Sequence, residues 1–172
     1  MELVKALRVN PKTRLAFVGA GGKTTAMFQL ARQLAPPVLV TATTHLATEQ
    51  LQLADRHITV TSPADVRAVA VGDGVYLFTG PVGEEARARG VEGDALDEIR
   101  KLAEDLHCPL LIEADGSRQL PLKAPADHEP PIPDFVDTVV VVAGLTGLGK
   151  PLSSNWVHRP EWFAALTGVE MG

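Results

Sequence analysis

The chain has little cysteine, few aromatic residues and no excess of positive charge. Its 172 residues include one cysteine, Cys108, so no disulfide can form within it, and this fits a reducing compartment. Acidic residues outnumber basic ones by 21 to 16, which argues against a nucleic-acid-binding surface and a nucleic-acid partner. Aromatic residues make up only 5%. A core built mainly from Val, Leu and Ala, with many glycine turns, is typical of an α/β domain.

Long apolar runs are missing as well. The longest spans residues 139–145, far short of the ~20 residues that cross a bilayer. The amino-terminal residues carry charges and lack the apolar run of a signal peptide. We therefore expect a cytoplasmic protein with no membrane partner. With 45% apolar and 22% charged residues, the chain has the balance of a globular protein, and residues 1–172 are expected to form a single domain.

Short apolar segments alternate with segments of helical periodicity. Strands are expected at 15–18, 38–40, 58–60, 75–78, 110–112 and 136–142, and helices at 24–34, 46–53, 94–106 and 161–166. A further helix should begin at Ser62-Pro63, an N-cap followed by proline in the first turn. The last strand ends in four valines, as in strands buried on both faces. The pattern predicts an α/β fold of three layers, with a mainly parallel central sheet flanked by helices.

The clearest chemical signal lies between the first strand and the first long helix. Residues 19–25 read Gly-Ala-Gly-Gly-Lys-Thr-Thr. Glycines let backbone N–H groups approach phosphate oxygens, and the helix start adds its positive end. We expect Lys23 to reach the terminal phosphates of a nucleotide as a catalytic cation, and Thr24 to bind Mg²⁺. The predicted cofactor-binding residues are Gly19, Ala20, Gly21, Gly22, Lys23, Thr24 and Thr25.

The spacing of this motif is shorter than the common one. Four residues usually separate the first glycine from Gly-Lys, and here there are two. A second run, at 144–150, has the full spacing, but Pro151 stands where the Mg²⁺-binding hydroxyl is needed. An ordinary glycine turn is the alternative interpretation of the first run, and a flexible glycine loop that of the second.

An acidic pair follows the strand expected at 110–112. Nucleoside triphosphatases hold Mg²⁺ with an acid near the phosphate loop, so we expect Glu113 to bind the metal together with Thr24. Strand alternation would place Asp115 on the same side, where it would orient a water or a substrate group as a catalytic residue. A turn cap is the alternative role for Asp115.

Polar segments after two strands complete the candidate site. Ligands of parallel sheets lie at the carboxyl ends of the strands, where the polar run 41–45 and the proline-rich loop 117–133 are expected. Helix capping by the threonines and simple solvation of the loop charges are the alternatives. The predicted substrate-binding or switch residues are Thr43, Thr44, His45, Arg118, Lys123, His128 and Glu129.

Several runs, taken together, resemble one family. They are residues 18–25, 41–45, 113–118, 120–125, 128–130, 140–144, 149–152 and 157–161. The chain resembles the selenium-dependent hydroxylase accessory proteins of the YqeC type. The resemblance implies a P-loop NTPase-like fold, with a short loop similar to that of the Mur and folylpolyglutamate ligases and a Glu-x-x-Gly like that of metal-center maturation GTPases. Proteins of this type run further at the C-terminus, so we expect this chain to lack a C-terminal segment of its relatives.

The leading hypothesis is a Mg²⁺-dependent domain that binds and hydrolyses ATP or GTP. The resemblance implies an accessory role in the maturation of selenium-dependent molybdenum hydroxylases, with such an enzyme or its cofactor-maturation proteins as partner. Two alternatives stay open. One is an ATP-dependent ligase that activates a small acid, and the other is a non-catalytic binding module that nucleotide switches between conformations.

Overall fold

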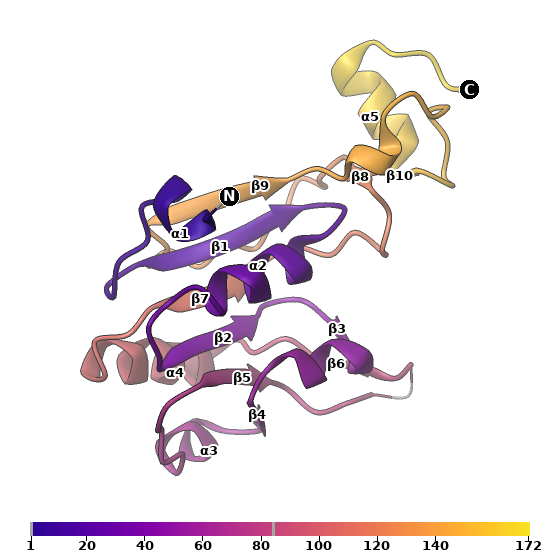
Figure 1. The fold of residues 1–172 in the computed structure, drawn as a ribbon. Helices are drawn as coiled ribbons and strands as arrows, with labels where there is room; N and C mark the ends of the chain where they lie inside the picture. The colour runs from indigo at the N-terminus through magenta and orange to yellow at the C-terminus, as the bar shows by residue number, and fades with distance from the viewer. Residues whose placement is uncertain (1, 84) are drawn as a thin grey trace.

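The centre of the fold is a sheet of six parallel strands, in the order β4-β5-β2-β7-β1-β9 (Figure 1). The computed structural model describes residues 2–83 and 85–172. The strands are β1 Arg14–Gly19, β2 Val38–Ala42, β4 Arg56–Thr59, β5 Val75–Thr79, β7 Leu110–Glu113 and β9 Thr138–Val142. Two short ribbons accompany the sheet: β3 (Leu46–Ala47) is antiparallel to β6 (Arg87–Ala88), and β8 (Leu122–Lys123) is parallel to β10 (Val157–His158).

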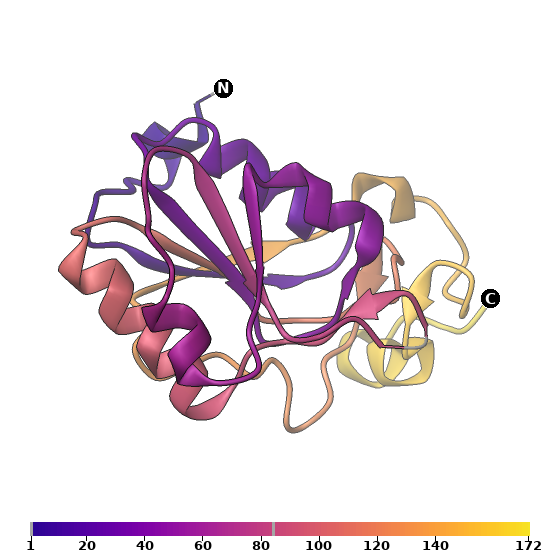
Figure 2. The same cartoon turned by 90° about the horizontal axis from the view of Figure 1, so that it is seen from below.

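Helices cover both faces of the sheet. They are α1 Leu3–Ala6, α2 Lys23–Ala31, α3 Pro63–Arg67, α4 Gly93–Asp105 and α5 Pro160–Thr167, with 3₁₀ turns η1 Thr48–Leu53 and η2 Leu145–Gly147. The view from below shows α2 on one face and α3 and α4 on the other (Figure 2). None of the helices in the described residues is long and apolar enough to cross a bilayer. The expected three-layer α/β architecture is confirmed.

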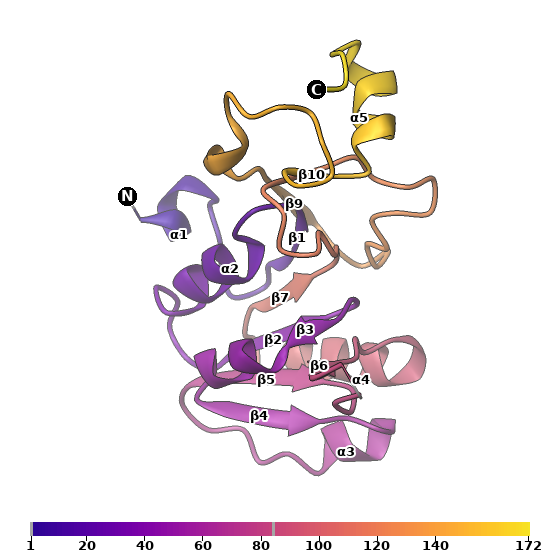
Figure 3. The ribbon, with the colours of Figure 1, turned by 90° about the vertical axis from the view of Figure 1, so that its right-hand side faces the viewer.

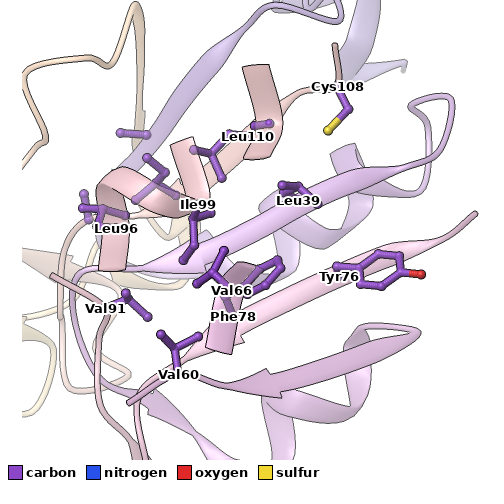
Figure 4. Close-up of a cluster of buried hydrophobic side chains, with 14 of the residues drawn as sticks. Leu39, Val60, Val66, Tyr76, Phe78, Val91, Leu96, Ile99, Cys108 and Leu110 are labelled. Atoms are coloured by element: carbon purple, nitrogen blue, oxygen red, sulfur yellow. The ribbon is translucent and has the colours of Figure 1, made fainter. Parts of the chain in front are cut away.

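The core has two halves because successive strand residues point to opposite faces. In β1, Ala16 and Val18 join the cluster under α4, whereas Leu15 and Phe17 join the cluster under α2. Figure 4 shows the first cluster, in which Ile99 of α4 lies over the sheet. This burial anchors the carboxyl end of β1, from which the glycine-rich segment leaves the sheet.

Two sequence-based expectations are wrong in detail. The strand ending in four valines is not buried on both faces: β9 is an edge strand that pairs only with β1 among the described residues, and Val141 is 76% exposed. The helix expected over 46–53 is instead the strand β3 followed by η1. Leu46 pairs with Ala88 across the β3–β6 ribbon, and this tertiary pairing overrides the local helical pattern.

Strand order determines which residues can meet at the site. β1 lies directly beside β7, with Phe17 paired to Glu113, so both strands end at the same edge of the sheet. The two segments that carry the expected chemistry therefore leave the sheet side by side. The elements β10 and α5 gather on the β9 side, far from β4 (Figure 3).

Candidate functional site

The glycine loop, residues 19–24, turns sharply from β1 into α2. Gly19, Gly21 and Gly22 all have positive φ, at 92°, 73° and 109°. Two of them are also packed against backbone. A Cβ at Gly19 would lie 2.3 Å from the Val142 carbonyl oxygen, and one at Gly21 would lie 2.4 Å from the Gly144 Cα. At Gly22 a Cβ would meet nothing within 4 Å. The loop thus needs its three glycines for their backbone conformation, and the first two of them, Gly19 and Gly21, for close packing as well.

Alanine substitutions should separate these two requirements. Gly21→Ala combines a backbone clash with a positive φ and is expected to destabilise the fold by about 2–4 kcal/mol. Gly22→Ala bears only the conformational cost, about 1–2 kcal/mol. Urea denaturation of the two variants measures the difference. Equal losses of stability would contradict the packing of the loop against Gly144.

Lys23, Thr24 and Glu113 converge where the glycine loop meets the end of β7. The Lys23 Nζ donates to the Gly19 carbonyl oxygen at 2.9 Å and lies 3.9 Å from Glu113 Oε1. The Thr24 hydroxyl donates to Glu113 Oε2 at 2.5 Å. All three residues are buried, with exposed fractions of 4–6%. The structure therefore brings together Thr24 and Glu113, the two residues expected to bind Mg²⁺, and metal binding itself stays a prediction.

Burial shifts both charged groups towards their neutral forms. It lowers the pKa of Lys23, against the opposing effect of the nearby Glu113 and Asp115 carboxylates. It raises the pKa of Glu113, against the hydrogen bond from Thr24 and the charge of Lys23. A buried acid and a buried base with shifted pKa values in one cleft are typical of functional sites, although structural ion pairs also produce such shifts.

Two further residues, neither of them among the predicted site residues, contact this centre. Gln50, in η1, donates through Nε2 to the Thr24 hydroxyl at 2.8 Å, while its Oε1 accepts from the Ala47 N–H at 2.9 Å. Ser117 Oγ lies 3.4 Å from the Lys23 Nζ. Gln50 occupies one of the two lone pairs of the Thr24 hydroxyl, whose proton is directed at Glu113.

Asp115 lies behind the glycine loop. Its Oδ2 accepts from the Gly19 N–H at 3.0 Å, and its Oδ1 forms an ion pair with Lys123. Lys123 also pairs with Glu129 at 2.8 Å, and Glu129 accepts two hydrogen bonds from Arg159, at 2.7 and 3.0 Å. We call Asp115, Lys123, Glu129 and Arg159 the ion-pair array. It joins the first residue of the glycine loop to the start of α5.

The array should make stability depend on acid pH. The Arg159 guanidinium, and then Lys123, hold the pKa of Glu129 well below its usual value of 4.5. Because the pKa is lower in the folded chain, this stabilisation is present above pH about 4.5 and is lost as the pH falls below it. The free energy of unfolding of Glu129→Gln should therefore fall less steeply in acid than that of the wild type. Denaturation curves collected between about pH 7 and about pH 3 test this; identical slopes would contradict it.

A cleft of about 540 Å³ opens in front of the glycine loop. Its walls include His45 and Arg118 of the predicted substrate or switch residues, together with Thr25. The other predicted residues lie elsewhere: the Thr43 hydroxyl donates to the Pro131 carbonyl at 3.2 Å, Thr44 packs beside Gly116, and His128 is exposed outside the cleft lining. Lys123 and Glu129 belong to the ion-pair array.

The second glycine run packs against the first. A Cβ at Gly144 would lie 3.0 Å from the Gly21 Cα, and the Gly144 N–H donates to the Pro121 carbonyl at 2.8 Å. Lys150 lies over the Trp156 ring at 4.8 Å and is not in the lining of the cleft. This run therefore supports the glycine loop through backbone contacts.

Comparison with known proteins assigns the family. The model of the YqeC protein family matches residues 15–161, which include every candidate site residue. The chain belongs to the YqeC family. It is 35% identical to an uncharacterized protein YqeC of Escherichia coli (strain K12), over 91% of this chain. The chain spans 61% of the length of that YqeC relative. No solved structure matches the chain.

Proposed function

We propose that the chain is a Mg²⁺-dependent nucleotide-binding domain that hydrolyses ATP or GTP. The observation that carries this proposal is the meeting of three buried side chains, Lys23, Thr24 and Glu113, at the glycine loop where β1 and β7 end. In an ordinary solvated glycine turn the lysine side chain would stay exposed, because burying its charged ammonium costs free energy. A terminal phosphate would provide the negative partner that buried Lys23 only partly has in Glu113.

The donor set fits magnesium. The Thr24 hydroxyl and Glu113 carboxylate oxygens are the hard ligands that Mg²⁺ prefers, and they lie 2.5 Å apart. Mg²⁺ usually takes only one or two protein ligands and keeps waters and phosphate oxygens for the rest. The absence, among the described residues, of a cluster of three acidic, His or Cys ligands is compatible with such a site. When bound, the metal would neutralise charge on the phosphate oxygens.

The protein groups would then have distinct tasks. The glycine loop would present backbone N–H groups to the phosphates, and Lys23 would hold the terminal one. Asp115, through the Gly19 N–H, holds the loop in shape from behind. With both its oxygens engaged, Asp115 is better suited to positioning the loop than to orienting a water, so we propose this role for it.

Calorimetric titration with Mg-ATP and Mg-GTP tests the proposal. One or both nucleotides should bind, and EDTA should weaken the binding strongly because Thr24 and Glu113 lose their metal. No binding of either nucleotide at millimolar concentrations would refute it. Phosphate release then separates hydrolysis from a switch: tight binding without release, alone or with a partner, would favour a binding module.

We propose further that the domain serves the maturation of selenium-dependent molybdenum hydroxylases, as the resemblance of its motifs implies. The partner would be such an enzyme or one of its cofactor-maturation proteins. Phosphate release measured with and without the purified hydroxylase tests this. Acceleration by the hydroxylase supports the role, and an unchanged rate together with no co-elution opposes it.

A further inference from the structure

The cleft extends well beyond the glycine loop. One wall comes from residues 21–25, where the proposed nucleotide phosphates would lie, and another from residues 116–119 after β7. A third group of lining residues follows β2 and β5, and includes His45, Gln50 and Arg87. Small-molecule pockets commonly have volumes of about 300–1,000 Å³, and this cleft, at about 540 Å³, falls within that range.

Two arginines reach this space from separate segments. Arg87, in β6, is partly buried and donates to the His45 carbonyl oxygen at 3.1 Å, which fixes its guanidinium at the cleft. Its charge opposes the rise in the pKa of Glu113 that burial causes, so it acts on the same centre as Lys23. Arg118 is exposed, and among the described residues its side chain forms no hydrogen bond or ion pair. Arginine binds carboxylates and phosphates through paired N–H donors.

The backbone is in an unfavourable conformation at Arg118 and directly before Arg87. Ala86, directly before Arg87, has φ 51°, and Arg118 and Gln119 have φ 50° and 63°. These three residues all line the cleft, and they are half of the six non-glycine residues with positive φ in the described chain. Such conformations persist where the surrounding structure imposes them, and they concentrate at ligand sites.

The acidic residues of the cleft leave the arginines available. Glu113 is engaged with Thr24 and Lys23 at the foot of the cleft. Glu49 and Glu85 are exposed, and neither forms an ion pair among the described residues. Solvated carboxylates at this exposure interact only weakly with neighbouring charges.

We propose that the cleft binds a second substrate, a small anion held by the guanidinium groups of Arg87 and Arg118 beside the nucleotide. This inference rests on the proposed function, because it takes the glycine loop as the nucleotide end of the cleft. The small anion and the terminal phosphate of the nucleotide would then lie in one cleft. Lys123 is not part of this subsite, because its ammonium is fully used in the ion-pair array.

The test uses the whole chain with Mg²⁺ and a saturating non-hydrolysable nucleotide analogue, so that the glycine loop is filled. Succinate and inorganic phosphate are titrated separately, and the two arms distinguish a carboxylate from a phosphate ligand. At least one should bind, and binding should weaken by about tenfold or more in Arg87→Gln and in Arg118→Gln. Arg89→Gln is the matched control, since Arg89 is exposed on the same segment outside the cleft lining.

Three outcomes decide the matter. Loss of anion binding in both cleft variants but not in Arg89→Gln supports the subsite. No binding of either probe, or equal binding by all variants, overturns it. If the analogue itself does not bind, the proposed function has failed, and the anion titrations are repeated without the analogue on the same variants and on Lys23→Ala. Anion binding that depends on Lys23 alone then overturns the subsite. Anion binding that depends on Arg87 and Arg118 supports it.

Discussion

Replacing Lys123 with alanine is expected to lower the free energy of unfolding by about 3–5 kcal/mol, because it breaks a buried ion pair by removing one partner. The Lys123 side chain is 2% exposed, and its ammonium contacts Asp115, the Gly116 carbonyl at 2.7 Å and Glu129 at 2.8 Å. Without it, the Asp115 carboxylate, which is 3% exposed, remains buried without its cation.

Urea denaturation at neutral pH measures the loss. Lys101→Ala is the matched control: Lys101 pairs with Glu98 at 3.7 Å, but its side chain is 57% exposed, so its removal should cost less than about 1 kcal/mol. The Asp115→Ala and Lys123→Ala double variant should lose less stability than the sum of the single losses. If Lys123→Ala is as stable as the Lys101→Ala control, the structural role of Lys123 is contradicted. The substrate-binding role predicted from the sequence would then be favoured.

The ion-pair array shows where sequence reasoning stops. Lys123 and Glu129 lie in one polar loop, and polar loops after strands suggest ligand contacts. Nothing local indicates that Glu129 pairs with Arg159, 30 residues later, or that Lys123 turns back to Asp115. Those contacts depend on the pairing of β8 with β10, two strands of two residues each that are too short to have a detectable period.

The sequence predicts the overall fold better than it predicts the surroundings of individual strands. Short apolar segments located all six strands of the central sheet, of which β1, β2, β5 and β7 are buried almost throughout. The burial of β9 was predicted wrongly, because four consecutive valines give the same pattern whether one or both faces of the strand are covered. Only the strand order reveals that Val141 lies on an edge strand.

The part of the candidate site that lies at the ends of neighbouring strands could be predicted from the sequence. A glycine loop after one strand and an acid after another must meet if those strands are neighbours, as β1 and β7 are. Gln50 could not be found in this way. It reaches Thr24 only because η1 folds back over the start of α2, and a glutamine in a polar segment carries no signal of its own.

Removing the Lys23 ammonium is expected to weaken Mg-nucleotide binding by about a hundredfold and to abolish phosphate release. A hydrogen bond to a charged group contributes about 1.5–3 kcal/mol, and about 1.4 kcal/mol corresponds to a tenfold change in affinity. Lys23 is the cation nearest to Glu113 in the site and is held over the glycine loop by the Gly19 carbonyl at 2.9 Å. Lys123 is committed to Asp115 and is therefore not available to replace it.

Two substitutions make this measurement specific. Lys23→Met keeps most of the buried volume and removes the charge, whereas Lys23→Ala removes both, so a shared loss of binding is due to the charge. Both should fold, because the Lys23 Nζ lies 3.9 Å from Glu113 Oε1, beyond hydrogen-bond distance, and Glu113 keeps its hydrogen bond from Thr24. Calorimetry on both variants, with Lys101→Ala as the control, gives the affinities. Wild-type binding by both would show that the glycine loop does not hold the phosphates, and the nucleotide assignment would fall with it.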